Sequence, residues 1–256
     1  MKPLNPKIAQ WQGRRVWIIG ASSGIGRALA ERLAGAGAEL ALSARGEAGL
    51  REIAREQDQV LPLDVADPVT LERVQDRLLA QWGGIDMTFY CAGVYHPMRA
   101  WEIDLQQVNA TLTINLQGVY NLLSVLLPHY LDRGQGGLCL LASVAGYSGL
   151  PKALAYGPTK AALINLAQIL YSDLSPRGIG IYLVNPGFVD TRLTRQNDFT
   201  MPALTSPDDA AREILDGIAR GRFEIDFPRR FTRPMKWLSR LPQRLRFYLL
   251  KRAATP

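Results

Sequence analysis

Residues 15–26, RVWIIGASSGIG, decide the fold of this 256-residue chain. Residues 15–20 form a short apolar run that is typical of a buried strand, and residues 25–35 carry the pattern of a helix. Glycines between them let the chain turn sharply and let an anion approach bare backbone N–H groups at a helix N-terminus. The spacing G-x-x-x-G-x-G therefore predicts a strand, an anion-binding turn and a helix in direct succession.

The same alternation of strand and helix patterns continues along the chain. Further strands are predicted at residues 39–44, 59–65, 86–92, 138–142, 180–185 and 222–227. The longer predicted helices occupy residues 104–130, 155–175 and 207–221, and Asp67-Pro68 supplies an N-cap and first position for another. We predict an α/β fold, a Rossmann-like, doubly wound, seven-stranded parallel sheet with helices on both faces, whose ligands bind beyond the carboxyl ends of the strands.

Length and composition indicate one globular domain spanning residues 1–256, with a core at about residues 13–227 and a C-terminal extension at 228–256. We expect no membrane-spanning helix, because no run of about 18 uncharged apolar residues occurs. No apolar segment of a secretory signal is seen near the N-terminus. Cys91 and Cys139 both lie in apolar runs, which favours buried free thiols in a reducing compartment and a cytoplasmic location.

The net charge of +7 belongs to one end of the chain. Residues 1–221 contain 20 basic and 21 acidic residues, whereas residues 222–256 contain 10 basic and 2 acidic residues. A neutral body argues against a nucleic-acid-binding protein. The basic tail also carries helically spaced apolar residues, divided by Pro242, so it could lie peripherally on an anionic membrane. The simpler interpretation is that it packs on its own subunit or on a neighbouring one.

The end of the second strand bears on the choice of a dinucleotide. Sites for NAD usually carry an acidic residue there, but this chain has Ser43-Ala44-Arg45. A guanidinium can bind a 2′-phosphate with two hydrogen bonds, so the sequence favours NADP(H) over NAD(H). The alternative is that Arg45 is a solvated loop residue. Asp64 could accept a hydrogen bond from an adenine amino group or form a turn before Asp67.

A second group of polar residues predicts acid–base chemistry. Tyr156 and Lys160 stand four residues apart, so a helix places both on one face. The ammonium of Lys160, near a positively charged nicotinamide, is expected to lower the pKa of Tyr156 toward neutrality. Ser143 ends a strand thirteen residues earlier, where its hydroxyl could hold a substrate oxygen.

With these motifs in place, the chain resembles the single-domain branch of the short-chain dehydrogenase/reductase family over roughly residues 13–227. The matching segments are the cofactor loop at 20–26, LDVAD at 63–67, the end of the N-N-A-G segment at 91–93, Asn115 in INLQG, the active-site residues Ser143, Tyr156 and Lys160, and the P-G motif at 185–191. Two departures stand out. Ile19 replaces the usual Thr, and Tyr90-Cys91 replaces an Asn pair whose hydrogen bonds steady the sheet in relatives.

The resemblance implies an enzyme that transfers hydride between NADP(H) and a carbonyl or secondary alcohol. Tyr156 would protonate the carbonyl oxygen, Ser143 would orient it, and Lys160 would also bind the nicotinamide ribose. Asn115 would relay through water to Lys160. Relatives usually form homodimers or homotetramers through the helices that carry Asn115 and Tyr156, and no metal is expected.

The predicted cofactor-binding residues gather at the carboxyl ends of the strands: Gly20, Ser22, Ser23, Gly24, Ile25, Gly26, Arg45, Asp64, Val65, Cys91, Ala92, Gly93, Tyr156, Lys160, Pro186, Gly187, Val189 and Thr191. The predicted substrate pocket is mostly apolar, which suggests a hydrophobic ketone or aldehyde as substrate. Its predicted lining residues are Tyr95, His96, Tyr147, Leu150, Phe188 and Leu193. The resemblance also implies a mobile lid over this pocket at residues 193–204. His96 is equally compatible with a surface loop, and His129 with a structural role.

Two other functions remain open. One is a non-catalytic dinucleotide sensor or scaffold, against which the intact set Ser143, Tyr156, Lys160 and Asn115 argues. The other is a membrane-associated reductase of a lipidic substrate, to which the basic tail would contribute.

Overall fold

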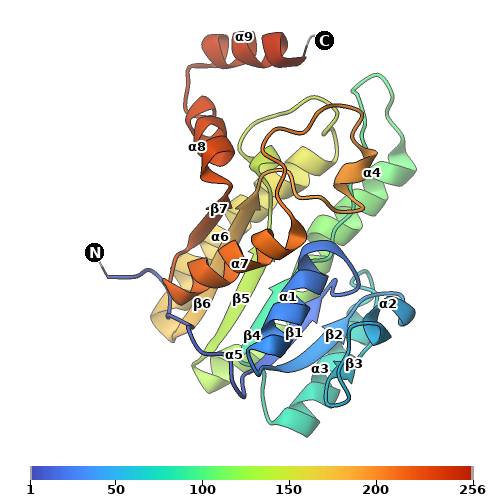
Figure 1. Ribbon diagram of the computed structural model, residues 1–256, viewed down its shortest axis with the longest axis vertical. Coiled ribbons are helices and arrows are strands. Elements are labelled where there is room, and N and C mark those ends of the chain that lie inside the picture. Colours follow the sequence, from blue (N-terminus) through green and yellow to red (C-terminus); the bar gives the residue numbers. More distant parts are fainter. Residues whose placement is uncertain (1, 255–256) are drawn as a thin grey trace.

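The computed structural model describes residues 2–254, with side chains as far as residue 250. Its seven parallel strands form one sheet in the order β3-β2-β1-β4-β5-β6-β7, which confirms the predicted doubly wound parallel sheet (Figure 1). The strands are β1 Arg15–Ile19, β2 Glu39–Ser43, β3 Gln59–Val60, β4 Met87–Tyr90, β5 Gly136–Leu141, β6 Ile179–Pro186 and β7 Glu224–Phe227. Because the order reverses between β1 and β4, the crevice for a ligand is expected beyond the ends of these two strands.

Helices cover both faces of the sheet (Figure 1). They are α1 Gly24–Gly35, α2 Ala48–Arg51, α3 Pro68–Trp82, α4 Leu105–Leu112, α5 Gly118–Arg133, α6 Tyr156–Leu174, α7 Pro207–Ala219, α8 Arg229–Leu238 and α9 Gln243–Ala254. On one face, Leu29 and Leu33 of α1 and Ile214 of α7 are fully buried against the sheet. On the other face, α3, α5 and α6 bury Leu78, Leu126 and other leucines in a second layer. Parallel strands buried on both faces explain why they are continuous apolar runs in the sequence.

Local signals place several of the turns as predicted. Asp67 caps α3, its carboxylate accepting a hydrogen bond from the backbone N–H of Val69, and Pro68 takes the first helical position. Gly83 ends α3 in the left-handed region at φ 68°. These residues fix where the chain turns back toward β4.

The prediction of a full strand at residues 59–65 is wrong in its length. The strand β3 covers only two residues. Beyond it, the N–H of Leu61 donates to the carbonyl of Leu42 in β2, and the N–H of Leu63 donates to the carbonyl of Ala44, which follows β2. Pro62 lies between them and has no N–H to donate. The segment stays extended but pairs on one side only.

The long helix predicted at 104–130 is interrupted by a π-turn. The α4 and α5 helices flank residues Thr113–Gln117, where the chain makes the wider π-type hydrogen-bonding pattern around Asn115. Such turns often occur at functional sites, because the extra residue reorients the side chains around it. Here it brings Asn115 inward, fully buried.

The continuous helical stretch Leu105–Arg133 is, by length and composition alone, long and apolar enough to cross a membrane, with a mean hydropathy of 1.3 over an 18-residue window. Length and composition therefore do not by themselves exclude a membrane-spanning helix here. The segment is apolar because much of it is core: Val119, Leu122, Leu126 and Tyr130 are fully buried within the fold. A core helix passes the same test as a membrane span.

The tail folds into the two short helices α8 and α9, with Pro242 between them. The helix α8 leaves the carboxyl end of β7 toward the end of the molecule that holds the loops after β4, β5 and β6 (Figure 1). The helix α9 lies beyond α8, away from the sheet. The spaced apolar residues of the tail do not share one face, because Leu238 is half-buried while Trp237 is 65% exposed.

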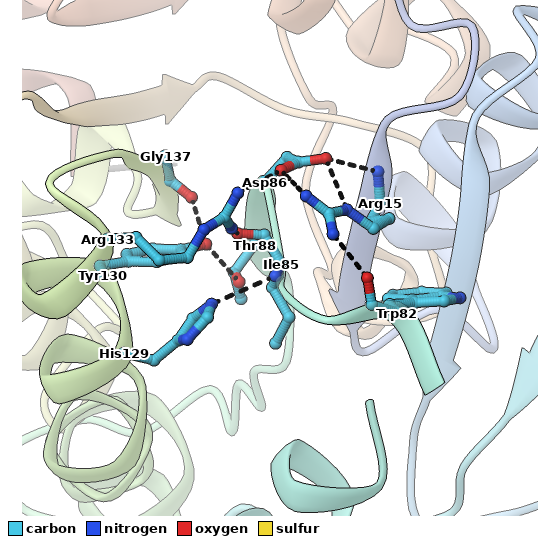
Figure 2. A network of polar contacts seen from close by, with 9 residues as sticks. All are labelled: Arg15, Trp82, Ile85, Asp86, Thr88, His129, Tyr130, Arg133 and Gly137. Atoms are coloured by element: carbon cyan, nitrogen blue, oxygen red, sulfur yellow. Dashed lines mark hydrogen bonds and ion pairs between the residues drawn. The ribbon is translucent and has the colours of Figure 1, made fainter. Parts of the chain in front are cut away.

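A polar network ties the opposite end of the sheet together (Figure 2). Asp86 accepts hydrogen bonds from the Arg15 guanidinium at 2.7 and 3.0 Å and from Arg133 of α5 at 3.1 Å. His129 accepts a hydrogen bond from the backbone N–H of Ile85 at 3.2 Å, in keeping with a structural role. The network joins β1, the start of β4 and α5 at the end of the sheet away from the predicted ligand site.

Candidate active site

The turn after β1 leaves no room for side chains. Gly20 has φ +91°, and a Cβ there would lie 2.6 Å from the backbone nitrogen of Ala92. A Cβ on Gly26 would lie 2.2 Å from the carbonyl oxygen of Gly20. Both positions therefore require glycine, and the turn packs directly against the chain that leaves β4.

The first turn of α1 is free to bind an anion. Its N-cap residue Ser23 makes no side-chain capping hydrogen bond, and no acidic residue lies in the first turn. The methyl carbon of Thr191, from the P-G segment, would lie 3.0 Å from a Cβ on Gly24. The residues present thus fit a pyrophosphate, held by backbone N–H groups at the helix N-terminus and flanked by Thr191.

At the end of β2, Arg45 is exposed and forms no ion pair with any residue whose side chain the structure describes. Nearby, the Ser43 carbonyl accepts hydrogen bonds from the N–H groups of Gly20 and Ala21, at 2.7 and 3.1 Å. Arg45 therefore follows a strand that is bonded directly to the glycine turn. Its guanidinium remains available for a phosphate in that region.

The structure gives Asp64 a turn-forming contact, because one carboxylate oxygen accepts the N–H of Ala66 at 3.0 Å. Its second oxygen is not used by that contact, so a bond to adenine stays a prediction. Val65 is buried.

Cys139 is buried as predicted, but Cys91 is only half-buried, and burial raises the pKa of both thiols.

The predicted acid–base residues come together beyond β5. The Nζ of Lys160 lies 5.4 Å from the ring centre of Tyr156 and donates to the carbonyl of Leu141 at 2.7 Å. Ser143 follows β5 and accepts the N–H of Ala145 at 3.1 Å, and its hydroxyl lies close enough to Tyr156 to interact with it. One turn at the end of β5 and one helix face therefore hold all three groups.

The protein's own groups do not lower the pKa of Tyr156. Burial raises it to about 12, which the hydrogen bond with Ser143 only partly offsets. Burial also lowers the pKa of Lys160, to about 8. Without a nicotinamide, the expected depression of the Tyr156 pKa is therefore not seen. The prediction also invoked a positively charged nicotinamide, and that charge would have to supply the difference.

Asn115 links these residues to the loop after β4. Its side-chain oxygen accepts the N–H of Val94 at 2.8 Å, and its amide donates to the Val94 carbonyl at 2.9 Å and to Thr159 at 3.3 Å. A Cβ on Gly93 would lie 3.4 Å from the Asn115 oxygen and 3.9 Å from the Nζ of Lys160. Gly93, Asn115 and Lys160 thus adjoin one another where the loop after β4 meets the acid–base group.

Aromatic side chains pack against two of the predicted site residues, Tyr156 and Phe188. Tyr95 packs edge-on against it, with ring centres 5.1 Å apart. The ring centre of Phe188 lies 5.6 Å from that of Phe199 in the lid and 5.4 Å from that of Phe231 in α8. Two separate segments, the lid and α8, therefore contact Phe188.

The other predicted pocket residues are less clearly placed. The Tyr147 hydroxyl donates to Glu224 of β7 at 2.7 Å, so it points toward the tail side of the sheet. His96, Leu150 and Leu193 are half-buried, and they stay predictions. Pro186 and Val189 are buried, and the Val189 carbonyl accepts the Thr194 hydroxyl at 2.5 Å.

The sequence reasoning missed Phe231, Glu224 and Thr159. Phe231 lies in the tail, where the spacing of apolar residues indicates no particular partner, and its ring centre lies 5.4 Å from that of Phe188. Glu224 is an acidic residue inside a predicted strand, and that position was a usable signal for a polar contact. Thr159 precedes Lys160 within the Y-x-x-x-K motif, but nothing in the spacing indicates its bond to Asn115.

Comparison with known proteins agrees with this geometry. The family model of the short chain dehydrogenases matches residues 14–201. The chain belongs to the short-chain dehydrogenase family. It is therefore an oxidoreductase with a Rossmann-type nucleotide-binding fold.

This short-chain dehydrogenase has relatives of similar length. It is 33% identical over 245 residues to an uncharacterised oxidoreductase of Myxococcus xanthus, covering 93% of this chain and 96% of the relative. It is 30% identical over 215 residues to the 3-oxoacyl-acyl-carrier-protein reductase of Escherichia coli, covering 83% and 84%.

Two solved structures superpose on the chain. A short-chain dehydrogenase from Sphingobium yanoikuyae in complex with NADPH has a TM-score of 0.77 at 27% identity, covering 90% of this chain and 97% of the other. One from Burkholderia cenocepacia in complex with NADP has a TM-score of 0.83 at 21% identity, covering 96% and 100%, and supports the fold.

Proposed function

We propose that the protein uses NADP(H) to interconvert a hydrophobic ketone or aldehyde and its alcohol. The observation that carries the proposal is the convergence of Ser143, Tyr156, Lys160 and Asn115 beyond the carboxyl ends of β4 and β5, next to the glycine turn. A non-catalytic binding protein would have no need for this complete set.

Each side chain has a distinct task in this proposal. When bound, the nicotinamide would supply or accept the hydride. The Tyr156 hydroxyl donates a proton to the carbonyl oxygen, and the Ser143 hydroxyl orients that oxygen. Lys160 is a buried cation whose positive charge favours the phenolate left after proton transfer. Asn115 holds the Val94 backbone beside them.

Replacing Tyr156 tests the chemistry. We expect Tyr156→Phe to reduce the rate of carbonyl reduction by on the order of 100-fold or more, because a positioned proton donor contributes about that much. The assay is NADPH oxidation across a panel of apolar ketones and aldehydes. NADPH affinity should change little. If the unaltered protein binds NADPH but reduces none of them, the alternative of a dinucleotide sensor is favoured.

The preference for NADP(H) rests on Arg45. Its exposed guanidinium has no carboxylate partner among the described side chains and follows the strand that is bonded to the glycine turn. We expect Arg45→Ala to weaken NADPH binding by on the order of 10- to 100-fold, the value of a lost charge-assisted hydrogen bond, and to leave NADH binding unchanged.

Calorimetric titration of both dinucleotides measures this preference. Arg51→Ala is the matched control, because Arg51 lies six residues further on and pairs with Glu47. Tighter binding of NADH than of NADPH by the unaltered protein would contradict the proposal.

We also propose a homodimer or homotetramer formed through α4, α5 and α6. The support is exposed apolar surface on these helices: Leu105 is 67%, Tyr120 48% and Ile169 51% exposed. Surface of this kind is typical of subunit contacts. Light scattering on the purified protein would give its mass, and a monomer at micromolar concentration would contradict the proposal.

A further inference from the structure

The segment beyond β7 is basic, and most of its described cations have no acidic partner. Residues 228–256, called the basic tail below, contain nine Lys or Arg and no Asp or Glu. Five arginines of the tail form no ion pair with any described side chain: Arg229, Arg230, Arg233, Arg240 and Arg244. All five residues are exposed: three lie on α8, Arg240 follows that helix, and Arg244 lies in α9.

One side of α8 is already occupied by the body of the protein. Phe231 packs against Phe188, and Lys236 forms an ion pair with Glu224. Thr232 is buried and donates to Asp226 at 2.5 Å. These contacts fix the orientation of α8, so that its arginines and Trp237 lie on the outer side.

Apolar side chains are exposed among these arginines. Trp237 is 65% exposed, Leu245 45% and Phe247 53%. The helix α9, which carries the last two, extends away from the sheet (Figure 1). Exposed aromatic and leucine side chains between cations require a partner that offers both negative charge and an apolar interior.

We propose that the basic tail binds an anionic lipid membrane at its interface. Lipid phosphates would accept hydrogen bonds from the arginines, while Trp237, Leu245 and Phe247 enter the boundary between headgroups and acyl chains. Another copy of the chain fits less well. Its own tail is equally basic, and residues 1–221 are nearly neutral, with 20 basic and 21 acidic residues. A nucleic acid would neutralise the arginines but would leave the apolar side chains without a partner.

Docking would also orient the rest of the molecule. Because the Nζ of Lys236 of α8 lies 5.9 Å from the ring centre of Tyr147, in the loop that follows Ser143, the tail is attached beside the candidate site. A docked tail would hold that end of the sheet close to the lipid. Membrane binding itself does not depend on the proposed catalytic function, so the test below needs no substrate.

The test is co-sedimentation of the full chain with vesicles of phosphatidylcholine, with and without about a quarter phosphatidylglycerol. We expect binding that requires phosphatidylglycerol and weakens with salt. Arg233→Glu/Arg240→Glu should reduce it by on the order of several hundred-fold, since the two reversals change the charge by four units and each unit near the surface contributes about fivefold. The matched control, Arg73→Glu/Arg77→Glu on exposed positions of α3, has the same net charge and should retain most of the binding.

A second variant tests the apolar contribution. Trp237→Ser/Phe247→Ser keeps every charge, and we expect it to weaken vesicle binding at least tenfold. Inorganic phosphate should compete no better than sodium chloride of equal ionic strength. The proposal is overturned if the charge reversals in the tail and the control reversals in α3 weaken vesicle binding by the same factor. It is also overturned if vesicles with and without phosphatidylglycerol bind the protein equally well. It is also overturned if the unaltered protein and the Trp237→Ser/Phe247→Ser variant both bind duplex DNA equally well and more tightly than vesicles. A Ser variant that forms a smaller oligomer but binds vesicles as well as the unaltered protein would overturn it too.

Discussion

At the scale of single residues, the Tyr90 hydroxyl supports the π-turn that carries Asn115. Tyr90 is buried, and its hydroxyl donates to the Ile114 carbonyl at 2.6 Å. By the family resemblance, Tyr90-Cys91 replaces an Asn pair whose hydrogen bonds steady the sheet in relatives. The structure shows a different hydrogen bond from the same strand end, made to the helix that carries Asn115.

Replacing Tyr90 by phenylalanine should therefore destabilise the fold. The ring is kept, but the Ile114 carbonyl loses its partner, which costs about 1–3 kcal/mol when the group is buried. Urea unfolding measures the change. Tyr171→Phe is the control, because the Tyr171 hydroxyl donates to Leu4 at 3.0 Å in an exposed position. If Tyr90→Phe and Tyr171→Phe lower the free energy of unfolding by the same amount, the role given to Tyr90 is contradicted.

At the scale of elements, an ion pair holds the predicted lid against the neighbouring loop. Lys152, in the loop that leads to α6, pairs with Asp198 of the lid, and Phe199 packs on Phe188. We expect Lys152→Gln to loosen the lid and to increase tryptic cleavage after the exposed Arg192 and Arg195 several-fold. Mass spectrometry of the cleavage products gives the rate at each site.

The matched variant Lys152→Arg keeps the charge and should leave the cleavage rate close to that of the unaltered protein. High salt should raise cleavage of the unaltered protein toward the Lys152→Gln rate, since the pair is exposed and screened. Identical rates for Gln and Arg variants would show that the pair does not hold the lid.

The elements also show what the sequence could predict. Local signals placed the glycine turn, the Asp67 cap and the spacing of Tyr156 and Lys160, because each depends on neighbours within a few residues. The π-turn was not predictable, since Asn115 takes its partners from Val94 and Thr159, 21 and 44 residues away. The contact of Phe231 with Phe188 likewise depends on where α8 packs, which helical periodicity does not specify.

At the scale of the whole molecule, Asp86 joins the sheet and α5 at the end opposite the candidate site (Figure 2). Partial burial alone would raise the pKa of Asp86, but hydrogen bonds from Arg15 and Arg133 outweigh it and lower the pKa from 3.8 to about 2. The unfolded chain then binds this proton more readily than the folded one, so stability falls as the pH drops from about 4 through 2. A shift of this size corresponds to about 2 kcal/mol at neutral pH.

His129 adds a second acid-sensitive step at higher pH. Burial, together with Arg133 and Arg15, lowers its pKa from 6.5, so protonation below about pH 6.5 also favours the unfolded chain. The substitution Asp86→Asn removes only the loss of stability that occurs between about pH 4 and pH 2. We expect the variant to unfold with about 2 kcal/mol less free energy than the unaltered protein at about pH 6, and the difference to narrow below about pH 4. Urea unfolding across this pH range measures it, and a difference that stays constant down to pH 3 would exclude Asp86 as the origin of the lower step. Because the network lies at the far end of the sheet, NADPH binding at neutral pH should be the same in both proteins.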